Sequence, residues 1–217
     1  MRNILFMLFL VLVMLGSGYA SDKDKPPTDY QGPIAERPKL VKGDRWEYTR
    51  RDQVISFEFA GEENGNLVFY VQWNGGGKMK NIRTPDLNFI KEFNKKGEIV
   101  EECNPYKGAL RFPLWIGKKW SYTFTTTKLA EHGGAGELAD RDSDVKVVSY
   151  EQIKVPAGTF WAFKIEEHRV TRGARGPKAR LGYNSTVWYS PEVKNIIKVE
   201  EDKEVYNRDL IKYIPAK

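Results

Sequence analysis

Gly43-Asp-Arg-Trp46-Glu-Tyr48 is a phrase that returns in the same pattern as Gly117-Lys-Lys-Trp120-Ser-Tyr122. Side chains alternate between the two faces of an extended strand, so the Trp and Tyr of each phrase point to the same side of a sheet. Each phrase therefore predicts a core strand that the chain enters through a glycine turn. A second, Pro-containing motif follows each copy, as Thr84-Pro85-Asp86-Leu87 and Ser190-Pro191-Glu192-Val193. Two unequal copies of one β unit are the expected plan.

Short alternating runs separated by turn residues continue through both halves of the chain. Gly61-Glu-Glu-Asn-Gly65-Asn66 and Val155-Pro-Ala-Gly158 have the composition of hairpin turns. No window after residue 20 shows a convincing helical period, and roughly eleven candidate strands can be counted. A sheet of that many strands must curl, split into two layers or close. The sequence predicts an all-β fold, a strongly curved antiparallel sheet or incomplete barrel, with two packed layers as the alternative.

The beginning of the chain has the pattern of a signal peptide. Residues 1–20 carry one positive charge, at Arg2, then an apolar run from Ile4 to Leu15, then small residues up to Ala20. The apolar run is shorter than the ~20 residues of a spanning helix, so no transmembrane segment is expected in the mature chain. No cysteine lies near the expected cleavage point. We therefore expect an exported protein, periplasmic or extracellular, that is not a lipoprotein.

By composition, the chain after residue 20 divides into two parts. Residues 21–42 contain four prolines among charged and polar residues, which is typical of a semi-extended tether. Residues 43–217 are expected to form a single β domain made of two units, 43–110 and 111–217. Cys103 is the only cysteine. Burial is its expected state, with a link to a second chain or a reactive thiol as alternatives.

The chain is basic, with 35 Lys and Arg against 29 Asp and Glu, a net charge of +6. Such a balance permits contact with anionic surfaces, although nucleic acid is not an expected partner of an exported chain. The positive charge is spread from Lys39 to Lys217, but one glycine-containing loop holds four cations with no acid expected to offset them. Its candidate contacts for phosphate or carboxylate groups are Arg172, Arg175, Lys178 and Arg180. Solvated loop residues are the alternative reading of these four.

Aromatic residues are abundant, with 6 Trp, 11 Tyr and 11 Phe. Most are expected to fill the core. A concave sheet lined by several of them can instead hold an apolar or amphiphilic ligand, a type of site found in the mouths of barrels. The candidates for that role are Trp73, Trp161 and Trp188.

Sequence motifs for catalytic and metal-binding sites are weak in this chain. Asp140, Asp142, Asp144 and Glu151 have the spacing of a calcium loop, but Val145 stands where that loop requires glycine, so a solvated acidic turn is expected. The chain has no nucleophile elbow, metal-binding cluster or phosphate-binding glycine loop. Its carboxylate pairs are sequence neighbours that project to opposite faces of a strand: Glu101/Glu102, Glu166/Glu167 and Glu200/Glu201. We expect no catalytic residue, no metal and no cofactor.

Motifs in the second half of the chain resemble those of a known group of proteins. Gly117-x-x-Trp120-x-Tyr122, Val155-Pro-Ala-Gly-Thr-Phe160 and Trp188-Tyr-Ser-Pro191-Glu-Val193 together resemble a widespread group of uncharacterised exported bacterial β proteins, a domain of unknown function. These motifs are turn and strand signatures spread over roughly a hundred residues. The resemblance implies a bacterial envelope protein with a curved antiparallel sheet, and it offers no catalytic residue to transfer.

Three functions follow in order of expectation. The first is a non-catalytic binding or carrier module of the cell envelope with an apolar or amphiphilic ligand. The second is an envelope scaffold that recognises another protein through exposed sheet edges and the Pro-rich tether. The third is a carboxylate-based hydrolase, since a glycosidase needs only two suitably placed carboxyl groups.

Overall fold

The structure is a computed structural model that describes residues 24–128, 137–173 and 176–217. The signal peptide expected at residues 1–20 lies outside these ranges. The strands are β1 (Ile34–Ala35), β2 (Arg45–Arg50), β3 (Gln53–Glu63), β4 (Asn66–Trp73), β5 (Met79–Arg83), β6 (Phe89–Phe93), β7 (Ile99–Lys107), β8 (Leu114–Trp115), β9 (Lys119–Lys128), β10 (Glu137–Val155), β11 (Gly158–Gly173), β12 (Gly176–Ser190), β13 (Asn195–Glu201) and β14 (Arg208–Ile214), with a short 3-10 helix at Glu204–Tyr206.

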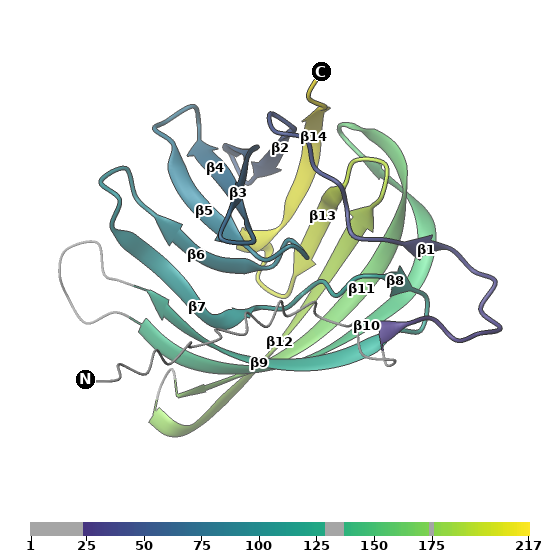
Figure 1. Ribbon diagram of the computed structural model, residues 1–217. Helices are drawn as coiled ribbons and strands as arrows, with labels where there is room; N and C mark the ends of the chain where they lie inside the picture. The colour runs from purple at the N-terminus through teal and green to yellow at the C-terminus, as the bar shows by residue number, and fades with distance from the viewer. Residues whose placement is uncertain (1–23, 129–136, 174–175) are drawn as a thin grey trace, which may run out of the picture.

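Twelve strands of the described chain form a closed antiparallel barrel, in the order β10-β11-β12-β13-β14-β2-β3-β4-β5-β6-β7-β9 (Figure 1). Two strand pairings join the first half of the chain to the second half and complete the ring. β14 pairs with β2, where Leu210 faces Tyr48, and β9 pairs with β7, where Thr126 faces Cys103. The expected all-β, strongly curved architecture is confirmed. The expectation of an incomplete barrel is wrong, because hydrogen-bonded partners continue all the way round the ring.

The two Gly-x-x-Trp-x-Tyr phrases hold corresponding places in the ring. Within the described chain, the first opens the run of six strands β2 to β7, and the second opens the run β9 to β14. Both are entered through a glycine with positive φ, 101° at Gly43 and 94° at Gly117. The Pro-containing motifs lie at the end of the fourth strand of each run. A non-glycine residue with positive φ closes the first, Leu87 at 64°, and follows directly after the second, Lys194 at 59°.

The barrel has two unlike ends, which the antiparallel register defines. The turns between β10 and β11 and between β12 and β13 lie at one end, here called the apolar end. The last residues of β9 and β11, Lys128 and Gly173, lie at the other, here called the polar end. Trp46 and Phe69 lie in the core, and the connection between β7 and β9 adds Leu110 and Leu114 to it.

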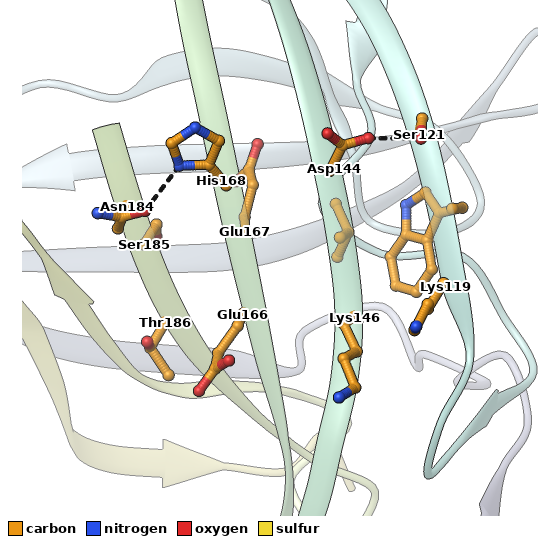
Figure 2. Close-up of a pocket in the computed structure, with 12 residues that line it drawn as sticks. Lys119, Ser121, Asp144, Lys146, Glu166, Glu167, His168, Asn184, Ser185 and Thr186 are labelled. Carbon is orange, nitrogen blue, oxygen red and sulfur yellow. Dashed lines mark hydrogen bonds between the residues drawn. The ribbon is translucent and has the colours of Figure 1, made fainter. Parts of the chain in front are cut away.

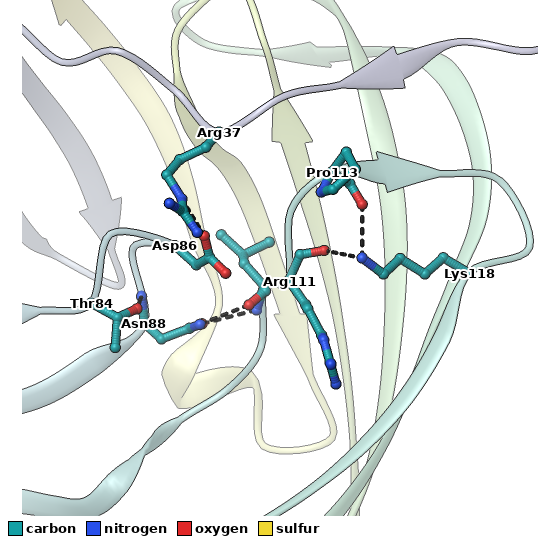
Figure 3. Close-up of polar contacts among 8 residues, drawn as sticks. Arg37, Thr84, Asp86, Asn88, Arg111, Pro113 and Lys118 are labelled. Atoms are coloured by element: carbon teal, nitrogen blue, oxygen red, sulfur yellow. Dashed lines mark hydrogen bonds and ion pairs between the residues drawn. The ribbon is translucent and has the colours of Figure 1, made fainter. Parts of the chain in front are cut away.

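Polar contacts fasten that connection to the rest of the barrel (Figure 3). Asn88 and Leu110 exchange two hydrogen bonds: the Leu110 N–H donates to Asn88 Oδ1 over 2.9 Å, and Asn88 Nδ2 donates to the Leu110 carbonyl over 2.7 Å. Lys118 Nζ donates to the carbonyls of Arg111 and Pro113 over 2.7 and 2.8 Å. These bonds hold an irregular segment in one position across the fold.

Residues 24–42, expected as a Pro-rich tether, lie against the barrel in the structure. Ala35 is buried in the core, and β1 pairs with β8. Arg37 forms an ion pair of 2.6 Å with Asp86 in the turn after β5 (Figure 3). Asp24 pairs with Arg111 over 2.6 Å.

The second position of each Gly-x-x-Trp-x-Tyr phrase holds a buried charge. Asp44 is 0% exposed and Lys118 is 3% exposed. Asp44 accepts hydrogen bonds from the backbone N–H groups of Val41 and Ala216, each over 2.9 Å, and from Lys194 Nζ over 3.2 Å. One carboxylate therefore joins the segment before β2, the segment after β14 and the turn between β12 and β13.

Asp44→Ala tests this junction. The substitution leaves two backbone donors and one lysine without their acceptor, so we expect the free energy of unfolding to fall by about 3 kcal/mol. Urea denaturation at neutral pH measures it. Arg37→Ala removes an exposed ion pair of the same N-terminal segment and is the matched control, with an expected loss below about 1 kcal/mol. Equal losses for the two variants would contradict the assignment.

Candidate functional site

Inward-facing side chains change from apolar to charged along the barrel axis. β11 shows the change within one strand: Phe163 and Ile165 are buried in the core, and Glu167 and Arg169 follow on the same face at 6% and 8% exposure. Residues two apart share a face, so the alternation places Glu166 outside the barrel and Glu167 inside it. The polar half of the interior thus begins at Glu167.

Glu167 lies at the centre of a hydrogen-bonded group. Tyr122 Oη donates to its Oε1 over 2.5 Å, and Arg169 binds both carboxylate oxygens, Nε to Oε1 over 3.1 Å and Nη2 to Oε2 over 2.7 Å. Burial pushes the pKa of Glu167 upward, but the charges of Arg169 and Lys107 and these hydrogen bonds outweigh it and hold the pKa below its usual value. Burial together with the Glu167 charge raises the pKa of Tyr122.

Further charges from other strands face this group. Burial lowers the pKa of Lys107, and the neighbouring charge of Arg169 lowers it further, against the opposing effect of Glu167 and Glu201. Burial raises the pKa of Glu201 against the charges of Lys107, Arg169 and Arg208. We call this set the interior charged cluster. Its members are Lys107, Tyr122, Glu167, Arg169, Glu201 and Arg208.

A second polar group lines the wall formed by β5 and β6. Arg83 Nε donates to Asn81 Oδ1 over 2.9 Å, and Asn81 Nδ2 donates to Glu92 Oε2 over 3.1 Å. Burial raises the pKa of Glu92 above its usual value. Arg83 also lies over aromatic rings, its Cζ 5.0 Å from the ring centre of Phe57 and 5.1 Å from that of Phe69.

Several of these inward-facing residues are only half buried, among them Arg83, Glu92, Lys107 and Arg208. A side chain that points into a closed ring stays accessible to water only where the interior itself communicates with solvent. The core around Trp46, in contrast, excludes water completely. Water therefore reaches part of these inward-facing charged side chains, whereas the core around Trp46 is fully buried.

The outer surface carries a separate groove of about 730 Å³ over β9, β10, β11 and β12 (Figure 2). A row of polar side chains crosses it at paired positions. Ser121 Oγ donates to Asp144 Oδ1 over 2.6 Å, and His168 Nδ1 and Asn184 Oδ1 share a hydrogen bond of 2.8 Å. The serine is bonded to the aspartate and not to the histidine, so the row lacks the nucleophile–base contact that acyl transfer requires.

The three candidate tryptophans do not converge on one site. Trp73 lies on the inner wall near the polar end, with Arg50 Cζ 5.4 Å from its ring centre. Trp161 is 49% exposed near the apolar end and stacks on Tyr150. Trp188 is 5% exposed and belongs to the buried core cluster. It pairs with Lys164 and Lys198 on the face of β12 opposite to that of Val187, and its indole N–H donates to Glu151 over 2.9 Å.

The basic loop and the acidic segment meet on the outer surface. Arg172 pairs with Asp142 of β10, so the expectation that no acid offsets this arginine is wrong, because the antiparallel register brings an acid from the neighbouring strand. Arg175 lies outside the described residues, and Lys178 and Arg180 belong to β12.

The expected acidic turn is likewise a strand. Asp140 and Asp144 lie on β10 and accept hydrogen bonds from Thr125 and Ser121 of β9. In the part of the chain that the structure describes, no three His, Cys, Asp or Glu side chains are placed to hold a metal ion. Cys103 is buried as expected, with its Sγ 3.4 Å from Thr126 Oγ1.

Sequence reasoning missed the charged interior. Glu167 and Arg169 carried a usable signal, because they share the strand face of Phe163 and Ile165. Arg83 and Arg208 carried none, because their meeting depends on the barrel closing between β14 and β2.

Comparison with known proteins gives a likeness in fold. No family model and no curated protein matches the chain. A Bacteroides fragilis protein described as exported, with a YmcC-like fold, is 15% identical at a TM-score of 0.48 and covers 83% of this chain and 99% of its own. YmcC of Escherichia coli K12, described as a hypothetical lipoprotein, is 10% identical at 0.49, over 81% and 87% of the two chains. A Parabacteroides distasonis protein described as a lipoprotein is 14% identical at 0.41, over 83% and 99%.

These descriptions correct one expectation. We expected an exported protein that is not a lipoprotein, and two of the three similar structures are described as lipoproteins. That expectation is therefore withdrawn. Among the described residues, no helix has the length and apolar character needed to cross a membrane.

Glu167→Gln tests the centre of the interior charged cluster. The substitution leaves Arg169 buried without its ionic partner, so we expect a loss of about 3 kcal/mol in the free energy of unfolding at pH 7. Glu166→Gln, one residue away on the outer face, is the matched control, with an expected change below about 1 kcal/mol. Urea denaturation of both variants and the wild type measures the difference.

The difference in unfolding free energy between the wild type and Glu167→Gln is expected to depend on pH. The folded pKa of Glu167 is lowered from 4.5, so its ionised form stabilises the fold above the unfolded pKa, and this contribution is lost as the pH falls through the folded pKa. The gap in stability between wild type and Glu167→Gln should therefore narrow when the pH is lowered below 4.5. A gap that stays constant down to pH 3 would contradict the ionic role.

Proposed function

We propose that this chain is a non-catalytic binding module of the bacterial cell envelope, whose ligand is an amphiphile that enters the barrel from the polar end. One observation carries the proposal: the interior is filled and apolar toward one end, and charged and accessible toward the other. An interior of this kind offers polar partners at a fixed depth and apolar surface beside them, which is the arrangement that orients a bound small molecule.

Apolar surface for the ligand's chain lies near the polar end. Trp73 lies on the inner wall beside Ile55 of the neighbouring strand. Leu181 of β12 is paired with Thr171 and shares the inward face of Tyr183, yet it is 45% exposed. An apolar side chain that points inward and still contacts water gains from being covered. We propose that the charged group of the ligand reaches the interior cations while its chain contacts Trp73 and Leu181.

A carboxylate-based hydrolase is the second candidate. It is favoured by the opposite pKa shifts of Glu167, which is lowered, and Glu201, which is raised, within one cluster. Both oxygens of Glu167 are, however, engaged by Arg169 and Tyr122, which leaves the carboxylate little freedom to attack a substrate or activate water. Binding without catalysis fits this arrangement better. Turnover of aryl glycosides or aryl esters that Glu167→Gln and Glu201→Gln both abolish would favour the hydrolase instead.

The scaffold hypothesis loses part of its basis. It relied on exposed sheet edges, and every strand of the described ring pairs on both sides. Within the described residues, β1 and β8 lie outside the ring, and they pair with each other over two residues each. Recognition of a partner by strand addition to the barrel would require the ring to open.

Native mass spectrometry of protein purified from its own host tests the proposed function. We expect a co-purifying amphiphile at one molecule per chain, which organic extraction removes. A chain that carries no amphiphile, and that binds none when titrated with dodecanoate, would overturn the proposal. A bound protein in place of a small molecule would favour the scaffold.

Tryptophan fluorescence locates the ligand. A dodecanoate brominated at the end of its chain quenches only those indoles that its chain contacts. We expect the Trp73→Phe variant to lose most of the quenching seen in the wild type, because Trp73 lies near the polar end. Trp161→Phe and Trp188→Phe should retain it, since one lies near the apolar end and the other faces out of the barrel. Loss of quenching in Trp161→Phe instead would move the site to the opposite end.

A further inference from the structure

Two half-buried guanidinium groups that face into the barrel have no ionic partner. Arg83 ends β5 and faces inward beside Leu67, and Arg208 begins β14 beside Val199. In the described part of the chain neither arginine forms an ion pair with a carboxylate. Arg83 Nε donates to Asn81 Oδ1, and the buried Arg208 Nε has no hydrogen-bond partner. Burying a cation without a counter-charge is unfavourable, so the pair requires an explanation.

The surroundings of these arginines do not neutralise them. Arg83 lies over Phe57 and Phe69, and Arg208 Cζ lies 5.5 Å from the ring centre of Tyr48. Cation–π contacts of this kind compensate only part of the cost of removing a cation from water. The carboxylates that influence the two arginines electrostatically are Glu92 and Glu201. Neither forms an ion pair with them, and burial disfavours the ionised state of both.

The two arginines also act on each other. Burial lowers the pKa of Arg83 to about 10, and the charge of Arg208 contributes to the shift. Both charges also act on the hydroxyl of Tyr48. The geometry agrees with this coupling, because Arg83 lies over Phe57, Arg208 lies over Tyr48, and the centres of these two rings are 5.8 Å apart.

We propose that Arg83 and Arg208 bind the anionic group, a phosphate or a carboxylate, of the ligand that occupies the barrel. Guanidinium groups suit this role because their planar donors match the oxygens of both anions. The inference rests on the proposed function and narrows it to an anionic amphiphile. The bound anion supplies the acceptor that Arg208 Nε lacks and offsets the repulsion between the two cations.

Calorimetric titration with three probes tests the proposal: dodecyl phosphate, dodecanol with the same chain and no charge, and inorganic phosphate. The variants are Arg83→Gln and Arg208→Gln, with Arg172→Gln on the outer surface as the matched control. Arg208→Lys keeps the charge and guards against loss of fold. We expect each interior Gln variant to weaken binding of dodecyl phosphate at least tenfold, Arg208→Lys to weaken it less, and Arg172→Gln to leave it unchanged. Dodecanol affinity should be the same in all variants.

The probes separate the possible results. Binding of inorganic phosphate that depends on both interior arginines supports the site and shows that a free anion suffices. Binding of dodecyl phosphate without inorganic phosphate, with the same dependence, supports the site and shows that the chain is needed. Equal affinity of wild type and both interior variants for dodecyl phosphate overturns the anion site, and the proposed function survives if dodecanol also binds. Failure of wild type to bind either dodecyl compound overturns both.

Discussion

Closure of the hydrogen-bonded ring is the constraint on which the rest of this structure depends. Once every strand has partners on both sides, backbone polar groups are satisfied without any further layer. The width of a barrel grows with its strand number, and eight strands already enclose enough space for side chains to fill. A ring of twelve, as the described residues form, encloses more. The chain fills part of that volume with Leu110 and Leu114 from the connection between β7 and β9, and lines the remainder with charge.

The arrangement of charged side chains inside the barrel reflects the free-energy cost of burying polar groups. Arg169 and Glu167 satisfy each other and Tyr122, so their burial strengthens one arrangement of β9 and β11. Arg83 and Arg208, inside the same ring, have no carboxylate partner among the described residues: Arg83 Nε donates to the neutral Asn81, and Arg208 Nε has no hydrogen-bond partner. A structure that balances one set of buried charges and leaves another unbalanced points to the second set as the place where something else binds.

Local features of the fold could be predicted from the sequence, and long-range ones could not. The shared face of Trp46 and Tyr48 and the opposite faces of Glu166 and Glu167 depend only on neighbouring residues, and these predicted faces agree with the structure. Ring closure depends on pairing between Leu210 and Tyr48, more than 150 positions apart, for which no short pattern exists. The offset of Arg172 by Asp142 was missed for the same reason, since register and not proximity in sequence joins them. The aromatic-lined site therefore stays a prediction, and the charged interior residues could not be predicted, because they come together only through pairing of distant strands.

The junction at Asp44 has a consequence for how the barrel is presented. Its carboxylate holds the backbone of Val41, just before β2, and of Ala216, just after β14. Asp24 likewise lies beside Lys118, which precedes β9. The segment after β14 is thus tied to the apolar end of the barrel, so a label placed on the described C-terminal residues is held on that side. Trp73 and Leu181 lie toward the opposite end, where such a label does not cover them.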